Sequence, residues 1–111
     1  MGKRRSEKET IKSDNLLVEF LLAHKGKANV VSSKEIAKYL TDCGYGITVQ
    51  SVNVKVKRVM KERRLPICHL SCYGYYWANT KDELKESIAD LESRIMAMNE
   101  HITHLKSFIF D

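Results

Sequence analysis

The sequence predicts a mainly α-helical chain that contains one small β-hairpin and ends in a long helix. Ser/Thr-x-x-Glu patterns at Ser32 and Thr80 indicate helix starts. Two β-prone segments, residues 67–70 and 75–78, surround a turn that contains glycine. Along roughly the last thirty residues, apolar residues then recur at alternating spacings of four and three.

Length and composition exclude several classes of protein. The chain has 111 residues, 43% of them hydrophobic and 30% charged, which is typical of one globular domain with or without an appendage. No apolar run approaches the roughly 20 residues of a membrane-spanning helix, and the start, MGKRRSEKET, is too polar for a signal peptide. Three cysteines cannot pair completely within one chain, which favours a reducing compartment. We therefore expect a cytoplasmic protein that does not contact a membrane.

The charge is distributed unevenly along the chain. Residues 1–80 carry 15 Lys and Arg against 7 Asp and Glu, whereas residues 81–111 carry 4 against 7. The segment KVKRVMKERR, residues 55–64, contains six basic residues and one acidic residue. This asymmetry indicates that the first part of the chain binds a polyanion and that the last part has a separate task.

The first elements are predicted from capping signals and apolar spacing. Residues 1–12 are expected to be a flexible basic segment. A first helix is expected to begin at a cap on Ser13 or Asp14 and to end at Gly26, with a short extended piece at 29–31. A second helix should begin at Ser32 and stop at Gly44.

The segment 48–64 is the one ambiguous element. Residues 52–56 alternate apolar and polar, which is typical of a strand. The whole segment is too long for a typical strand, and its valines at 49, 52, 56 and 59 lie on one side of a helix. We therefore expect a third helix, capped by Thr48. Pro66 should end this third helix. Gly74 should supply the positive φ that the hairpin turn needs, and Thr80 should cap a last helix.

This order of elements resembles the winged helix-turn-helix of bacterial, phage and mobile-element DNA-binding proteins. Residues 31–64 resemble the helix-turn-helix, and residues 65–83 resemble a wing that ends in the phrase Gly-Tyr-Tyr-x-Ala. The resemblance covers roughly residues 13–82, and it implies a winged domain at 13–79 whose helix 48–64 enters the major groove of DNA.

The residues expected to contact DNA lie mostly on the polar face of the segment 48–64. Gln and Arg can pair with adenine and guanine edges, a Val methyl can touch a thymine methyl, and Lys and Arg can bind phosphates. A serine at the start of the second helix and a tyrosine at the hairpin tip complete the expected site. The set is Ser33, Gln50, Ser51, Val54, Lys55, Lys57, Arg58, Lys61, Arg64 and Tyr73.

The segment 80–111 shows an unbroken heptad pattern. Isoleucines fill position a and mostly leucines fill position d, a combination that favours a parallel two-stranded coiled coil. The e and g positions carry no clear charge code, so an antiparallel pair or a higher oligomer is left open. The residues expected to dimerise are Leu84, Ile88, Leu91, Ile95, Met98, Ile102, Leu105 and Ile109.

The sequence gives little support for a metal site or for catalysis. Cys68, Cys72 and His69 lack the second ligand pair of a structural zinc site, so no metal or other cofactor is expected. The chain has no Gly-rich phosphate loop, nucleophile elbow or convincing carboxylate pair, and we expect no enzyme activity.

The expected function is therefore sequence-specific binding of double-stranded DNA by a homodimer, as a transcriptional regulator or replication-associated factor of a bacterium or phage. One alternative is single-stranded nucleic-acid binding, with Tyr73, Tyr75 and Tyr76 as stacking platforms. The other is a protein-interaction adaptor assembled through its coiled coil.

Overall fold

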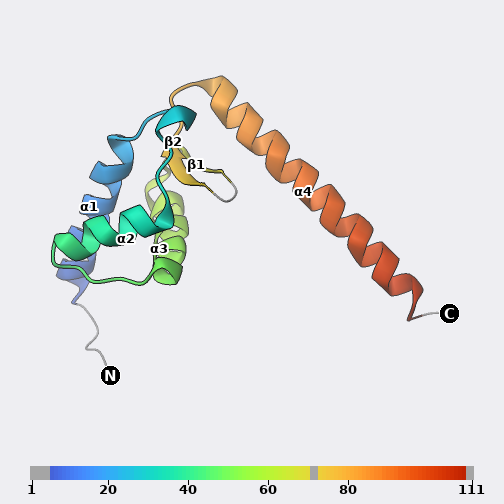
Figure 1. Cartoon of the computed structure of the whole chain (residues 1–111), viewed down its shortest axis with the longest axis horizontal. Helices are drawn as coiled ribbons and strands as arrows, with labels where there is room; N and C mark the ends of the chain where they lie inside the picture. The colour runs from blue at the N-terminus through green and yellow to red at the C-terminus, as the bar shows by residue number, and fades with distance from the viewer. Residues whose placement is uncertain (1–5, 71–72, 110–111) are drawn as a thin grey trace.

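The structure is a computed structural model that describes residues 6–70 and 73–109. Residues 1–5 of the expected N-terminal segment, and Ser71 and Cys72 of the expected turn, lie outside this range. The described chain is mainly helical, with a two-stranded antiparallel hairpin and a long C-terminal helix, which confirms the expected class (Figure 1). The elements are α1 (Glu7–Leu22), the 3-10 turn η1 (Lys27–Asn29), α2 (Ser33–Asp42), α3 (Val49–Arg63), β1 (Ile67–Leu70), β2 (Gly74–Trp77) and α4 (Lys81–Ser107).

The prediction of where the first helix begins is wrong. α1 begins at Glu7, and its N-cap is Ser6, whose hydroxyl accepts a hydrogen bond from the N–H of Glu9 at 3.2 Å. Ser13 and Asp14, the expected caps, are buried inside the helix. The carboxylate of Asp14 faces cations of α3 instead of helix N–H groups. Residues 7–12, expected to be flexible, are therefore helical.

The end of α1 also differs from the prediction. The helix ends at Leu22 and its C-cap is Ala23, so Gly26 is not the cap. Gly26 adopts φ 90° before η1, and its N–H donates to the carbonyl of Trp77 at 2.8 Å. Residue 29 belongs to η1, and only Val31 of the expected extended piece bridges to the hairpin. The tertiary bond to β2 thus fixes the conformation at Gly26.

The remaining helix starts are confirmed. Each of Ser32, Thr48 and Thr80 accepts a side-chain hydrogen bond from the backbone N–H three residues later, at 3.1, 3.1 and 3.2 Å. The segment 49–63 is helical, which removes the strand interpretation of residues 52–56. Arg64 closes α3 in the left-handed region with φ 55°.

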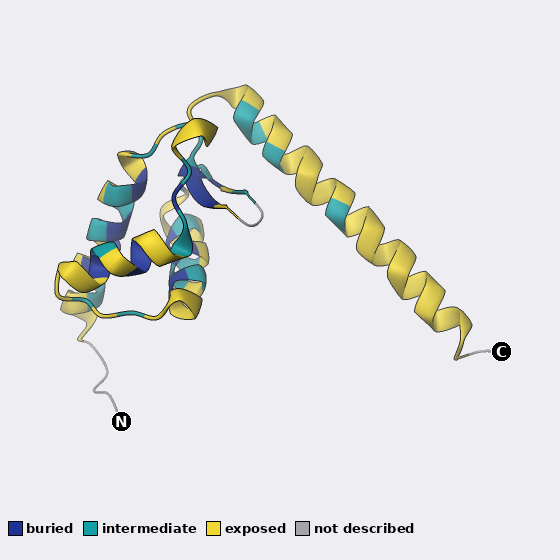
Figure 2. Ribbon diagram, viewed as in Figure 1, coloured by how far each residue is buried: buried dark blue, intermediate teal, exposed yellow. Residues whose placement is uncertain are grey.

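The core lies where α1, α2 and α3 converge beneath the hairpin, as the buried stretches show (Figure 2). The valines of α3 pack into it at three of the four expected positions. Val49 does not, since it is 45% exposed at the first turn of the helix, which extends beyond the core. The buried cluster consists of Leu17, Leu21, Val31, Ile36, Ala37, Leu40, Val52, Val56, Val59 and Tyr75.

The hairpin is bonded to the helical core through β2. β1 pairs with β2, and on the other edge of β2 the N–H and carbonyl of Tyr75 bond to the carbonyl and N–H of Val31 at 2.7 and 2.8 Å. Gly74 begins β2 with φ 127°, and a Cβ there would lie 1.9 Å from the Val31 carbonyl oxygen. The expected glycine is therefore required twice, for its backbone angle and for the close approach of the Val31 segment.

α4 leaves the hairpin and extends away from the other helices (Figure 1). Only its first turns touch the domain, and most of the helix is exposed (Figure 2). It ends at Ser107, where the N–H groups of Phe108 and Ile109 form short-range bonds to Leu105 and Lys106. Ile109, expected to continue the heptads, thus lies in a terminal turn after the helix. Among the described residues, no helix combines the length and apolar character needed to cross a bilayer.

Candidate nucleic-acid interface

α3 presents two distinct sides. Its valines at 52, 56 and 59 are buried against α1 and α2. The opposite side of the helix carries Gln50, Val54 and Lys61, which are all exposed. Lys57 borders these three on the side of the hairpin and is also exposed. We call these four residues the outer stripe of α3.

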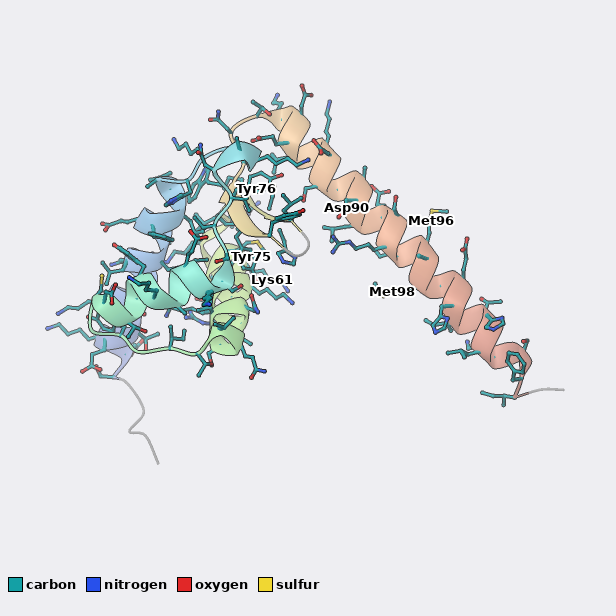
Figure 3. All side chains as sticks on the ribbon, viewed as in Figure 1. Lys61, Tyr75, Tyr76, Asp90, Met96 and Met98 are labelled. Atoms are coloured by element: carbon teal, nitrogen blue, oxygen red, sulfur yellow. The ribbon has the colours of Figure 1, made fainter. Side chains whose placement is uncertain are left out.

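The outer stripe has the chemistry of a nucleic-acid contact. Val54 is 70% exposed, although an apolar side chain gains nothing from water. No hydrogen bond or ion pair holds the side chains of Gln50, Lys57 or Lys61 within residues 6–70 and 73–109. Lys61 is directed outward from α3, away from α1 (Figure 3). An amide, a methyl-bearing side chain and two ammonium groups are therefore available for an external partner, and no carboxylate belongs to the stripe.

Lys55 and Arg58, also expected to contact DNA, have an internal partner. The buried carboxylate of Asp14 accepts from Lys55 Nζ at 2.6 Å and from Arg58 Nη1 and Nη2 at 3.0 and 2.8 Å. The Lys55 side chain is only 10% exposed, and Arg58 pairs also with Glu62 at 3.0 Å. These two cations hold α3 against α1, so we no longer assign them to base recognition.

The electrostatics of Asp14 follow from this arrangement. Burial acts to raise the pKa of Asp14, but the hydrogen bonds from Arg58 and Lys55 outweigh burial and hold the pKa below its usual value. The same bond raises the pKa of Arg58. Asp14 and Arg58 are thus both ionised in the folded chain at neutral pH. Together with Lys55 they form the ion-pair triad that joins α1 to α3.

Ser33 and Ser51 are also engaged within the molecule. The Ser33 hydroxyl donates to Asn53 Oδ1 at 2.6 Å, and the Tyr75 hydroxyl donates to the same oxygen at 2.7 Å. The Ser51 hydroxyl accepts from Thr48 at 2.9 Å. Asn53 therefore joins the start of α2, the first turns of α3 and the hairpin into one unit.

A hollow of about 310 Å³ lies beside this unit. It is lined by residues from the start of α2, from α3 and from the hairpin tip, and Lys34 and Tyr73 are among them. Tyr73 is 65% exposed, as a contact residue at the tip should be. Arg64, at the other end of α3, is exposed too. These residues extend the outer stripe on both sides.

The structure adds three residues that the sequence analysis did not select. Asp14 and Asn53 fix the position of α3, and Lys34 adds a cation at the hollow. The adjacency of Lys34 to Ser33 in sequence was a usable signal. Asp14 and Asn53 gave none, because their partners are 41 or more and 20 or more residues distant along the chain.

The hairpin tyrosines do not form the stacking platform of the single-strand alternative. Tyr75 and Tyr76 are 4% and 3% exposed. Of the three tyrosines proposed for that role, only Tyr73 presents its ring to solvent. Successive bases would lack successive rings on which to stack.

The apolar positions of α4 form a second candidate surface. From Ile88 to Leu105 the expected seam is uncovered, with each a and d side chain about half exposed. Met98 lies on this face and Met96 on the opposite face of the helix (Figure 3). From Ile88 to Leu105, the apolar seam of α4 is therefore not buried against the chain's own domain.

No cluster of three or more His, Cys, Asp or Glu side chains suited to a metal occurs among the described residues; Cys72, part of the zinc pattern considered above, lies outside them. Comparisons of the chain with protein-family models, curated proteins and solved structures find no match. The functional argument therefore depends on the geometry of the chain itself.

Proposed function

We propose that the protein is a winged helix-turn-helix protein that binds double-stranded DNA as a homodimer. In this proposal α3 lies in the major groove, the hairpin is the wing, and α4 pairs two copies. The observation that carries it is the outer stripe of α3, which is exposed, cationic and free of internal partners among the described residues while the rest of the helix is fixed.

Two features of the fold support the winged-helix assignment. α2 and α3 follow each other through a short connection, and α3 projects its outer stripe beside a hairpin. The hairpin is joined to the segment before α2 through the Val31–Tyr75 pair, which makes it part of the domain. An α-helix fits the major groove, where base edges are distinguishable.

Homodimerisation supports binding because a single helix offers few contacts. Two copies joined by α4 would engage two half-sites, and the second contact then gains from a high effective concentration. The acidic C-terminal segment keeps α4 away from phosphates. Such a protein would act in transcription or replication in the cytoplasm of a bacterium or of a cell infected by a phage.

The test compares Lys61→Ala with Lys38→Ala in binding to a labelled random-sequence duplex across a salt series. Lys38 lies on α2, outside the outer stripe, where it is 81% exposed and pairs with Asp42 at 3.4 Å, so both variants lose one exposed cation from each chain. We expect Lys61→Ala to weaken duplex binding about tenfold and to reduce the salt slope by about two, since each chain of the dimer loses one phosphate contact, with Lys38→Ala near wild type. Equal effects of the two variants would contradict the assignment of α3.

A second arm tests the class of partner. Gln50→Ala should reduce discrimination among duplex sequences selected from a random pool, since the exposed amide of Gln50 would pair with a base edge in this proposal. Preference for the single strand would favour the first alternative. Absence of binding to both forms at physiological salt would favour the adaptor, in which α4 recruits a protein.

A further inference from the structure

The cavity between α4, the hairpin and the end of α3 has an unusual charge distribution. It measures about 420 Å³ and is lined by Lys57, Met60, Ile67, His69, Tyr75, Ser87, Leu91 and Arg94. Three of these side chains are basic and none is acidic. Burial, followed by the positive charges of Arg94 and Lys57, lowers the pKa of His69, which is consistent with an excess of positive potential.

The cations of the cavity are only partly compensated within the chain. Arg94 contacts Asp90 through Nη2 alone, at 2.8 Å, which leaves other N–H groups of the guanidinium available. Lys57 has no ion pair among the described residues. A carboxylate of a binding partner could therefore contact basic side chains in a cavity whose apolar lining is Met60, Ile67 and Leu91.

The cavity opens beside the seam of α4. Ser87 and Arg94 occupy heptad position g and Leu91 occupies position d, so the domain stands on the g side of its own helix. In a parallel two-stranded coiled coil, g of one helix faces e of the next heptad of its partner. Ser87 would then face the partner's Glu92, and Arg94 would face the partner's Asn99.

We infer that a second copy of this chain covers the cavity in a parallel coiled coil, with the partner's Glu92 carboxylate entering it beside Ser87 to pair with Lys57. This inference rests on the homodimer of the proposed function and specifies its orientation and its charge contact. In the assembly, each α4 touches both winged domains near the end of α3. Lys57, at the hairpin side of the outer stripe, then serves the dimer contact, and Gln50, Val54 and Lys61 are left for DNA.

The antiparallel arrangement fits the same cavity poorly. With Ile88 level with the partner's Leu105, position g faces g and position e faces e. Arg94 would meet the partner's His101, and Lys85 would meet the partner's Lys106. The partner's His101 would then be a fourth basic side chain in a cavity that already holds three. Isoleucine at position a with leucine at position d also favours the parallel form.

Charge reversal tests the contact through the dimer dissociation constant, measured by sedimentation on the full chain. Glu92→Lys should weaken the dimer about tenfold, since two symmetric contacts are lost and repulsion replaces them. Lys57→Glu combined with Glu92→Lys should recover most of the affinity. Glu100→Lys is the matched control, because position f changes charge on the outer side of the helix; its effect should be small.

Cysteine cross-linking tests the orientation. Leu105→Cys places a thiol at position d, where only a parallel pair brings it against itself, and Met96→Cys places one on the opposite face. We expect a cross-linked dimer under mild oxidation from Leu105→Cys alone, since the native cysteines are common to both variants. A dimer that Leu105→Cys does not cross-link, or equal effects of Glu92→Lys and Glu100→Lys, would overturn this inference alone. A chain that is monomeric at all concentrations would overturn the homodimer as well.

Discussion

Asp14, in the middle of α1, accepts a bidentate hydrogen bond from Arg58 of α3, at 3.0 and 2.8 Å. Lys55 donates to the same carboxylate at 2.6 Å. One buried carboxylate thus fixes both the distance and the rotation of α3 relative to α1. Its consequence for function is indirect, because the rotation decides which residues of α3 face outward.

Asp14→Asn should destabilise the folded chain by about 3 kcal/mol, since breaking a buried ion pair leaves an uncompensated charge. Lys55 is the more affected cation, as its side chain is 10% exposed and cannot readily return to water. Lys55→Met in the Asp14→Asn background should recover part of the loss. Chemical denaturation of the single and double variants measures both; a loss within about 0.5 kcal/mol would show that the triad does not stabilise the fold.

The low pKa of Asp14 predicts the pH dependence of stability. Above about pH 5 the carboxylate is ionised in the folded and the unfolded chain, so its contribution is fully present. Below the unfolded pKa of about 3.9 the unfolded chain binds the proton first, and the contribution is lost as the pH falls through the folded pKa. Denaturation between pH 7 and pH 2 should give a steeper acid decline for wild type than for Asp14→Asn. Parallel profiles would contradict the lowered pKa.

Gly74→Ala should be destabilising by about 3 kcal/mol, because it combines a disfavoured positive φ with a steric clash. The added Cβ would lie 1.9 Å from the carbonyl oxygen of Val31, which is backbone and cannot rotate away. Gly44→Ala separates the two effects, since Gly44 has φ 95° but nothing within 4 Å of its Cβ position. Thermal unfolding should therefore rank wild type above Gly44→Ala, and Gly44→Ala above Gly74→Ala. The reverse order of the two variants would mean that hairpin docking is not tight.

Met98→Lys and Met96→Lys form a matched pair for the seam of α4. The two methionines are 59% and 65% exposed in the single chain and lie on opposite faces. We expect Met98→Lys to raise the dimer dissociation constant about a hundredfold or more, because each dimer loses two buried apolar side chains. Met96→Lys should leave it near wild type. Sedimentation over a range of concentrations measures both, and equal behaviour would place the interface elsewhere.

Elements whose signals are local can be predicted from the amino-acid sequence without the fold. The capping residues Ser32, Thr48 and Thr80 form their bonds within one helical turn, so three helix starts are readable without tertiary information. The positive φ of Gly74 and the periodic apolar face of α4 are local in the same sense, whereas the close approach of Val31 to Gly74 is a tertiary contact.

Which polar residues are available to a partner depends on contacts between distant parts of the chain. Asp14 has the side chain of a helix cap, yet it is buried because two cations of α3 compensate its charge. Those cations, Lys55 and Arg58, have the chemistry of DNA contacts and are held inside the fold by the same carboxylate. Helical periodicity places a side chain on a face, but it does not show which distant residue covers that face. The energy of an ion pair depends on groups far apart in sequence, and for this reason the division of α3 into a fixed side and an outer stripe required the folded chain.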